Sequence, residues 1–189
     1  ANTGAGNVIV CDVTGKYAAT IGQKGTGDGE LSKPTGVCVS GDKLFVTDPA
    51  LSRISVFGLD GRFIQNFGSG SPWAITTFEN RIYATDNVAG RVNVYGSDGA
   101  SVTSFGSPGS GQGQLGNPKG ITILDGKCYV SSFANNRVDI FELDGKHVGI
   151  LGLPVEQAAA SFGRPTGLAI SGDNLIISDA IRNKIITYK

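Results

Sequence analysis

Apolar residues along this chain occur in short runs rich in Val, Ile, Phe and Tyr, and each run is bounded by Gly, Pro, Asn or Asp. Short β-branched and aromatic runs between turn-forming residues are typical of strands. No segment keeps the spacing of an amphipathic helix, and only residues 156–161 fit a single helical turn within a loop. The pattern therefore predicts an all-β protein made of many short strands.

The same Gly-bounded pattern returns four times along the chain. Each copy runs from a Gly through a short alternating stretch to an apolar residue and a second Gly, at residues 15–22, 61–68, 99–106 and 145–152. A self-similar period of about 40 residues indicates an array of small supersecondary units. The period thus defines the general shape of the molecule and leaves its chemistry open.

Four prolines align the units: Pro34, Pro72, Pro118 and Pro165. After each proline come a first strand, a turn, a second strand, a third strand that begins with Arg or Lys, and in most units the Gly-bounded fourth strand. An Asp-Gly pair precedes the fourth strand, and this pair is a strong hairpin signal. Four antiparallel strands per unit describe a β-propeller blade, whereas the coils of a linear β-solenoid are usually shorter.

The units form a single propeller region with incomplete ends. Residues 34–71, 72–117 and 118–164 are predicted as complete blades, and residues 1–33 and 165–189 as partial blades. The first partial blade lacks its two inner strands, and the last lacks its outer strand. We expect about four visible blades, and the chain to be either a window from a longer propeller or a subunit that a neighbour completes. Unpaired strand edges invite pairing with another chain.

The blades share a consensus sequence. It reads Pro-Thr-Gly-Val at 34–37, Leu-Phe-Val-Thr-Asp at 44–48, Arg-Ile-Ser-Val-Phe at 53–57 and Asp-Gly at 60–61, and the units at the later prolines repeat it. Over nearly its whole length the chain therefore resembles the NHL-repeat β-propeller family. The resemblance implies a propeller, usually of more than four blades, that serves mostly as a binding platform. Members of the family include protein-binding and RNA-binding modules, secreted bacterial proteins and a few enzymes.

An acidic and a basic residue recur on either side of one turn in each blade. The pairs are Asp48 with Arg53, Asp86 with Arg91, and Asp179 with Lys184. We expect each pair to meet across its turn as a structural ion pair. The third unit has Ser132 in the acidic position, so we expect Arg137 to lack a local carboxylate and to be available for a partner.

The composition is that of a globular protein and argues against several function classes. Apolar residues make up 40% of the chain and charged residues 17%, and the formal net charge is +0. A neutral chain lacks the strong attraction to phosphate that drives nucleic-acid binding. No apolar run approaches the roughly 20 residues that a membrane-spanning helix needs. Because the chain begins at Ala1 without Met, we expect processing, trimming or an internal stretch.

Two Gly-rich loops, residues 22–30 and 106–116, stand out between the strands. Residues 111–116 formally match a dinucleotide fingerprint, but they do not link a strand to a helix, so we expect a flexible loop between blades. Asp28 and Glu30 lack the alternating acidic ligands of a calcium loop, and we expect them to be solvated surface charges.

Catalytic residue types are sparse. His147 is the single histidine, so neither a catalytic triad nor a multi-histidine metal site is available. Lactonase-type propellers hold calcium with carboxylates and Asn in the central channel, whereas the inner strands here offer Cys38, Ser40, Thr76, Thr122 and Ala169. We therefore expect a protein that is not an enzyme and that has no cofactor and no metal. The alternative is a calcium-dependent hydrolase whose site lies in blades outside this sequence.

The three cysteines, Cys11, Cys38 and Cys128, match no zinc spacing. Two interpretations stay open: all three are small buried apolar residues, or Cys11 and Cys38 form a disulfide, which requires an oxidising compartment. Few charges, abundant Gly, Ser and Thr, and the absence of Met favour an extracellular setting.

Two aromatic residues break the repeat pattern on one face of the predicted propeller. This loop face is formed by the loops that join second to third strands and fourth to first strands. Trp73 and Phe133 stand at positions that carry no aromatic residue in the other units. Aromatic residues of this kind are reasonable partner anchors, and local packing over the blade is the alternative. The candidate partner-binding residues are Trp73, Phe133, Arg137 and Arg182.

The sequence as a whole favours a non-enzymatic interaction or assembly module. We expect a protein partner, either further copies of the chain or additional blades, and no membrane span. Self-assembly through the unpaired terminal strands into an oligomer or filament is one version of this hypothesis. The alternative is binding of single-stranded RNA at the loop face, which carries a weakly basic set of side chains: Lys24, Lys33, Lys119, Arg137, Arg164 and Arg182.

Overall fold

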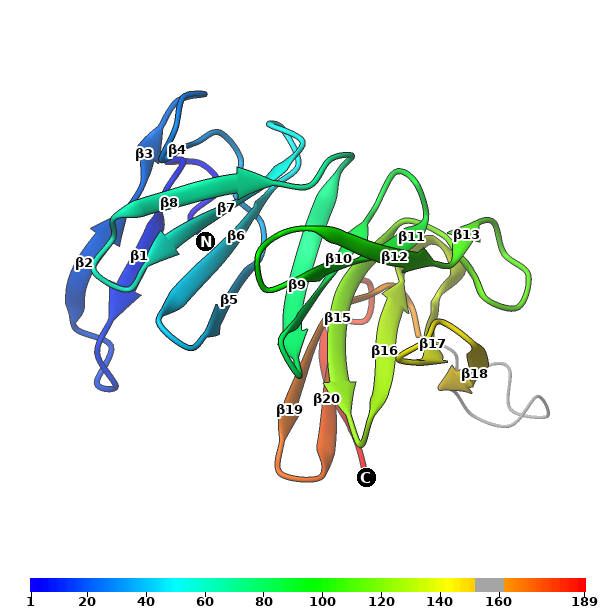
Figure 1. Cartoon of the computed structure of the whole chain (residues 1–189). Coiled ribbons are helices and arrows are strands. Elements are labelled where there is room, and N and C mark those ends of the chain that lie inside the picture. The colour runs from blue at the N-terminus through cyan, green and yellow to red at the C-terminus, as the bar shows by residue number, and fades with distance from the viewer. Residues whose placement is uncertain (152–161) are drawn as a thin grey trace.

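The computed structural model describes residues 1–151 and 162–189 and shows an all-β chain (Figure 1). Five antiparallel sheets of two, four, four, four and three strands follow one another along the sequence. This arrangement confirms the predicted blades, including the incomplete first and last ones. The helical turn predicted at residues 156–161 lies outside the described residues.

The strands have the following bounds. The first hairpin consists of β1 (Val8–Cys11) and β2 (Tyr17–Ile21). The second sheet contains β5 (Val37–Ser40), β6 (Lys43–Asp48), β7 (Arg53–Gly58) and β8 (Phe63–Phe67). The third contains β9 (Pro72–Phe78), β10 (Arg81–Asp86), β11 (Arg91–Gly96) and β12 (Ser101–Phe105). The fourth contains β15 (Pro118–Leu124), β16 (Lys127–Ser132), β17 (Arg137–Glu142) and β18 (His147–Leu151). The last contains β19 (Pro165–Ser171), β20 (Asn174–Asp179) and β21 (Lys184–Tyr188).

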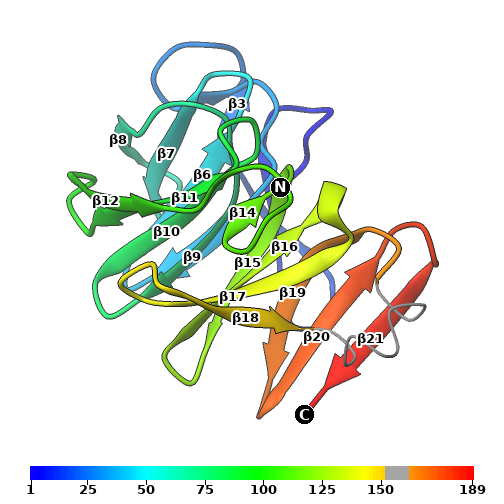
Figure 2. The ribbon, with the colours of Figure 1, turned by 90° about the vertical axis from the view of Figure 1, so that its right-hand side faces the viewer.

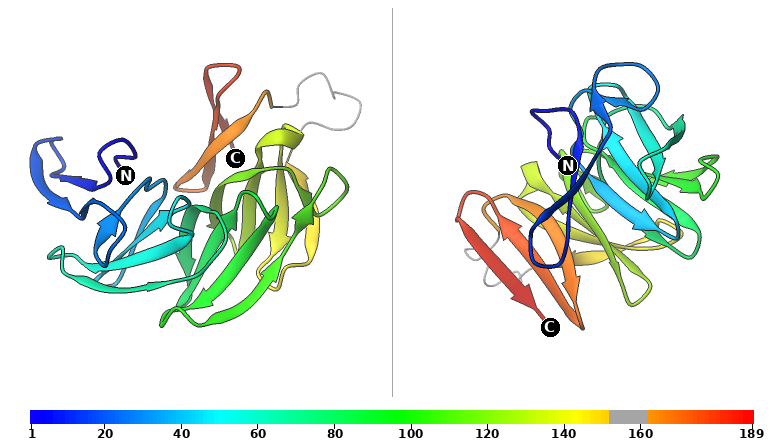
Figure 3. Two further views of the ribbon diagram at one scale, coloured as in Figure 1. Left: turned by 90° about the horizontal axis from the view of Figure 1, so that it is seen from above. Right: turned by 90° about the vertical axis from the view of Figure 1, so that its left-hand side faces the viewer.

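The sheets are arranged around a common axis. Within each complete sheet the strands are hydrogen-bonded in chain order. The first strands β5, β9, β15 and β19 contact one another in sequence, so they are innermost. Viewed from above, the sheets follow an arc that begins with the hairpin β1–β2 (Figure 3). From the side, the three-stranded last sheet lies next to β15–β18 (Figure 2). This is the face-to-face blade packing of a β-propeller.

The hydrophobic core is divided into four clusters, and each lies between two successive sheets. Phe45 and Ile54 of the second sheet, for example, pack against Ile82 and Tyr95 of the third. The middle strands are apolar on both faces because a neighbouring blade covers each face, and most of their side chains are buried. Adjacent blades therefore stabilise one another, and no single sheet has a core of its own.

Buried hydroxyl groups fasten successive blades to each other. Thr47 Oγ1, at the end of β6, accepts a hydrogen bond from the backbone N–H of Gly36 at 2.8 Å and contacts the carbonyl oxygen of Trp73 in the next blade at 2.8 Å. Ser131 Oγ repeats the second contact at 2.9 Å with the carbonyl oxygen of Thr166. Both hydroxyl residues have an exposed fraction of 0%. These blade junctions place the inner strands at a fixed separation.

Glycine is needed where the inner strands approach each other. A Cβ built at Gly120 would overlap the carbonyl oxygen of Thr166 in the next blade. The second complete blade has Ala74 at the equivalent position. At that junction the hydroxyl of Thr85 lies 3.5 Å from the carbonyl oxygen of Lys119, the longest of the three contacts. We attribute the wider junction to the methyl group of Ala74.

The recurring aspartates bind backbone amides and not basic side chains. Asp48 is fully buried, and its carboxylate accepts hydrogen bonds from the backbone N–H groups of Ser32 at 2.6 Å and Lys33 at 3.2 Å. Within the described ranges, no carboxylate lies within ion-pair distance of Arg53, which donates to the carbonyls of residues 26, 27 and 30. The predicted ion-pair staple is therefore wrong, because backbone groups of the preceding loop bind both side chains, although Arg53 Nε has no hydrogen-bond partner among the described residues.

The same backbone capping recurs in the later blades. Asp179 accepts hydrogen bonds from the N–H groups of Gly163 at 2.6 Å and Arg164 at 3.0 Å. Burial by itself raises the pKa of Asp179, but the backbone donors outweigh it and hold this pKa below its ordinary value. In the third complete blade Ser132 Oγ performs the role, accepting from Gly116 N–H at 2.8 Å.

The cysteines are all free thiols, so the predicted Cys11–Cys38 disulfide is wrong. Cys11 is exposed and Cys38 half-buried, so uniform burial is wrong as well. Cys128 alone fits the apolar-filler interpretation, and burial raises the pKa of its thiol to about 12.

Candidate functional site

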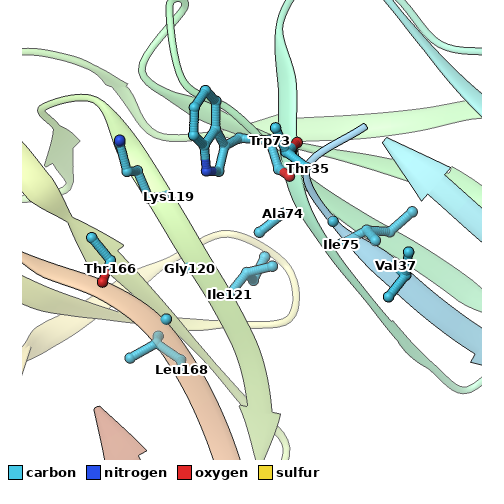
Figure 4. A pocket seen from close by; sticks show the side chains of 12 residues that line it. Thr35, Val37, Trp73, Ala74, Ile75, Lys119, Gly120, Ile121, Thr166 and Leu168 are labelled. Carbon is cyan, nitrogen blue, oxygen red and sulfur yellow. Dashed lines mark hydrogen bonds between the residues drawn. The ribbon is translucent and has the colours of Figure 1, made fainter. Parts of the chain in front are cut away.

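The first strands of the blades and the residues just before them line a pocket, which we call the channel (Figure 4). Its cavity has a volume of about 420 Å³. The residue directly after each repeat proline lines it, and we call these four the channel rim: Thr35, Trp73, Lys119 and Thr166. Two positions further along each strand the lining becomes apolar, with Val37, Ile75, Ile121 and Leu168. The channel thus combines a chemically varied rim with a uniform apolar interior.

Two rim residues belong to a stack that crosses the blades. The ammonium nitrogen of Lys119 lies 4.4 Å from the ring centroid of Trp73 and 4.4 Å from that of Phe133. The guanidinium carbon of Arg164 lies 5.1 Å from the Phe133 centroid. We call these four residues the aromatic–cation cluster. Each such contact contributes about 0.5–1 kcal/mol at an exposed site.

Sequence reasoning had singled out Trp73 and Phe133 separately, and the structure brings them together through Lys119. Lys119 had been grouped only with a weakly basic surface. A signal for the pairing with Trp73 was present, because the two residues occupy equivalent positions in adjacent blades. The sequence contains no comparable signal for the contact of Phe133. This residue begins the short 3₁₀ turn η1 (Phe133–Asn135), and the position of that turn depends on the fold.

The rim hydroxyls already have hydrogen-bond partners, whereas the cluster cations have no acidic ones. Thr35 Oγ1 donates to the carbonyl of Trp73 at 2.6 Å, and Thr166 Oγ1 lies 2.9 Å from Ser178 Oγ. In the part of the chain that the structure describes, neither Lys119 nor Arg164 has a carboxylate within 4.0 Å. The cluster is therefore locally positive although the whole chain is neutral.

Arg137 lies away from the rim and has a carboxylate of its own, contrary to the sequence-based expectation. Its Nε is 2.9 Å from Asp139 Oδ2, and its Nη groups donate to the carbonyls of Ser110, Gly111 and Gln114. The expectation failed because Asp139 is two residues along the same strand and not across the turn. Arg137 thus fastens a Gly-rich loop.

That loop and its counterpart near the N-terminus are more regular than the sequence suggested. The strand β13 (Ser107–Pro108) pairs in parallel with β14 (Gln114–Leu115), and β3 (Gln23–Lys24) pairs likewise with β4 (Glu30–Leu31). Glu30 was expected to be a solvated charge, yet it accepts hydrogen bonds from nearby backbone N–H groups. That of Gly27 contributes most to lowering the pKa of Glu30.

The remaining candidates lie outside the channel. Arg182 is exposed in the turn after β20, where its backbone N–H donates to Asp179 at 3.1 Å. His147 Nε2 lies 3.1 Å from Asp139 Oδ1, next to Phe141. Across residues 1–151 and 162–189, no group of three or more His, Cys, Asp or Glu side chains is arranged to hold a metal ion. The same residues contain no helix long and apolar enough to cross a membrane.

Comparison with known proteins gives two partial sequence relatives, and no family model matches the chain. The chain is 42% identical over 55 residues to RING finger protein nhl-1 of Caenorhabditis elegans, covering 29% of this chain and 6% of that protein. It is 43% identical over 47 residues to protein lin-41 of the same organism, covering 24% of this chain and 4% of that protein. The chain therefore spans only a small part of these curated relatives.

Solved structures share the architecture at low sequence identity. Virginiamycin B lyase from Staphylococcus aureus superposes with a TM-score of 0.63 at 19% identity, over 82% of this chain and 55% of that one. The computationally designed Ika8 protein gives 0.60 at 12% identity, over 93% and 49%. Ika4, also designed, gives 0.59 at 11%, over 83% and 91%. Identities at this level show the fold alone.

The blade packing and these structural neighbours define the class of the protein: it is a β-propeller. The partial similarity to nhl-1 and lin-41, together with the consensus repeated along the chain, supports an NHL-repeat propeller.

Proposed function

We propose that the protein is a non-catalytic protein-binding module whose partner docks on the loop face, at the mouth of the channel. The observation that carries this proposal is the clustering of the residues that depart from the repeat. Trp73 and Lys119 occupy equivalent positions in adjacent blades and Phe133 lies in a turn, yet all three share one stack beside the channel. Side chains needed only for the propeller would be expected to recur from blade to blade.

The chemistry of the cluster suits an interface. Half-buried Trp and Phe rings next to Arg are the residue types enriched among the side chains that dominate binding energy. The buried junction hydroxyls hold the inner strands, so a partner would meet rims in fixed positions. Less conformational entropy is lost when a binding surface is already ordered. The resemblance to NHL-repeat propellers, a family used mostly as binding platforms, supports this role.

A peptide-display selection tests the proposal. The wild-type protein is used to select binders from a random peptide library, and each selected sequence is then measured against the double variant Trp73→Ala/Phe133→Ala. We expect the variant to weaken these peptides at least about tenfold, as loss of one or two central aromatic anchors does.

The matched control is Tyr17→Ala, which removes an exposed aromatic side chain from the hairpin β1–β2, away from the channel. This variant should bind the selected peptides as the wild type does. If the library yields no binders, or if Trp73→Ala/Phe133→Ala binds them unchanged, the proposed docking site is wrong.

A second proposed role, self-association through the terminal blades, rests on a separate observation. The last sheet has three strands, and its Ile185 side chain is 75% exposed. Ser178 occupies the junction position of Thr47 but contacts only its own blade. Light scattering across protein concentrations should show oligomers that Ile185→Glu dissociates. A strict monomer at all concentrations would exclude this role.

A further inference from the structure

We infer that the channel mouth selects an acidic peptide, with a carboxylate at Lys119 and, two residues further along the peptide, an apolar side chain in the channel. The inference rests on the proposed function and specifies the chemistry of the partner. It depends on the polar groups of the rim, on the spacing along β15, and on the distribution of charge around the cluster.

Lys119 is the charged side chain of the rim, and its hydrogen-bonding capacity is unused within the described residues. The hydroxyls of Thr35 and Thr166 are engaged within the protein. The ammonium of Lys119 contacts two ring faces but makes no hydrogen bond with any of the described residues. An ammonium has three donors, and ring contacts leave them available for a carboxylate.

The surroundings of Lys119 strengthen its attraction for an anion. The side chain is half-buried between Trp73 and Phe133, where the effective dielectric is lower than in bulk water. Arg164 adds a second positive charge next to the Phe133 ring. None of the residues that line the channel is acidic. A carboxylate at this position therefore meets two cations and no like charge.

The apolar part of the ligand follows from the strand geometry. Lys119 and Ile121 both line the cavity and are two residues apart on β15. The pairing of β15 with β16 shifts register between Pro118 and Ile121, but Lys119 and Ile121 both line the cavity. In an extended peptide, residues two apart are separated by about 6.6 Å and point to the same side. Such a peptide can direct a carboxylate to Lys119 and an apolar side chain toward Ile121 and Leu168. The favoured sequence is acidic residue, any residue, apolar residue.

A nucleic acid fits the observations less well. Single-stranded nucleic acid is usually held by a continuous positive groove that follows its phosphates. Here the positive charge beside the channel comes from Lys119 and Arg164, and the chain as a whole is neutral. The channel interior is apolar and offers no donors for further phosphates.

The test uses Trp73, the single tryptophan of the protein, as a fluorescent reporter within the site. Two blocked peptides that differ at one position are titrated: acetyl-Gly-Ser-Glu-Ser-Leu-Ser-Gly-amide and the same peptide with Gln in place of Glu. We expect saturable quenching or a spectral shift with the Glu peptide, at least about tenfold weaker binding of the Gln peptide, and weakening of the Glu peptide by salt.

Lys119→Gln should abolish the preference for the Glu peptide. The matched control is Lys33→Gln, which removes an exposed lysine of the loop face that does not line the channel. That variant should keep the full preference. Circular dichroism and melting confirm that each variant is folded.

Several outcomes would overturn the inference. They are equal binding of the two peptides, absence of any response to the Glu peptide, or an unchanged preference in Lys119→Gln. An oligouridylate that displaces the Glu peptide and binds more tightly would assign the mouth to nucleic acid instead. If display selects peptides that need Trp73 but carry no acidic residue, the proposed function stands and the acidic specificity is wrong. If display also fails, both are wrong.

Discussion

The blade junctions and the channel rim are neighbouring regions of the molecule, but they differ in how far their side chains vary. At the junctions the next-to-last residue of each second strand carries a hydroxyl: Thr47, Thr85, Ser131 and Ser178. At the rim the equivalent positions carry Thr, Trp, Lys and Thr. The constant positions hold the blades together, and the variable positions meet the solvent at the channel mouth.

The comparison separates structural from functional candidates without any appeal to other sequences. A junction position makes the same contact in successive blades, so the fold alone explains its side chain. The rim positions carry different side chains, and these gather at one place, so a binding partner is needed to explain them. The residues where the two regions meet give the most direct tests.

The largest effect is expected at Gly120. Alanine at this position would place its methyl group against the carbonyl oxygen of Thr166 and close to Ser131 Oγ. We expect Gly120→Ala to lower the free energy of unfolding by about 3 kcal/mol, because the inner strands must separate. Gly167→Ala is the control, since among the described residues a Cβ built at Gly167 would approach only Ser178 Oγ of its own blade. Chemical denaturation measures both, and equal losses would contradict the close-approach argument.

Removal of a junction hydroxyl should have the next largest effect. Ser131→Ala deletes the acceptor of the Gly120 N–H and the contact to the Thr166 carbonyl, and it leaves the buried N–H unpaired. We expect a loss of about 2 kcal/mol in the free energy of unfolding. Ser178→Ala, at the same position in the last blade, should lose less because no blade-to-blade contact is present there. Denaturation curves in which the two variants coincide would rule out the junction role.

The sequence predicted the strands and blades well because local signals determine them. The Asp-Gly turns and the short β-branched runs act within a few residues, and the observed hairpins β7–β8 and β11–β12 follow them. The same reasoning failed for Asp48 and Arg53. Their proximity across the turn was right, since they are register partners, but their hydrogen bonds go to a preceding loop that only the fold brings near.

The site was predictable only in part for the same reason. Trp73 and Phe133 were visible as departures from a repeat, which is a property of the sequence. Their joint contact with Lys119 depends on the approach of adjacent blades, which the repeat pattern does not specify. The expectation for Arg137 was wrong because its partner Asp139 has no acidic counterpart in the two preceding blades. The equivalent positions there carry Ser55 and Asn93.

Acidic pH should weaken the caps formed by the aspartates and leave the cap formed by Ser132 unchanged. The folded-state pKa of Asp179 is lowered, so the unfolded chain takes up the proton first as pH falls. This carboxylate therefore stabilises the fold fully above about pH 4, and the contribution disappears below that value. Asp179→Asn should reduce the difference in melting temperature between pH 7 and pH 3, by an amount equivalent to about 1 kcal/mol. Asp173→Asn, in the exposed turn before β20, is the control and should leave the difference unchanged.

The smallest effect on stability is expected at Ala74, where junction and rim meet. Ala74→Gly removes the methyl group that we hold responsible for the 3.5 Å separation of Thr85 Oγ1 from the Lys119 carbonyl. A shorter contact stabilises the fold, but glycine within β9 costs about 0.5–1 kcal/mol of conformational entropy, so the net change should stay within about 0.5 kcal/mol. The surroundings of the rim side chains should change more than the free energy of unfolding does. Trp73 directly precedes Ala74, and Lys119 carries the carbonyl that moves. We therefore expect a shift in tryptophan fluorescence at nearly constant melting temperature. An unchanged spectrum would mean that the junction and the rim are independent, and that the width of this junction does not set the position of the cluster.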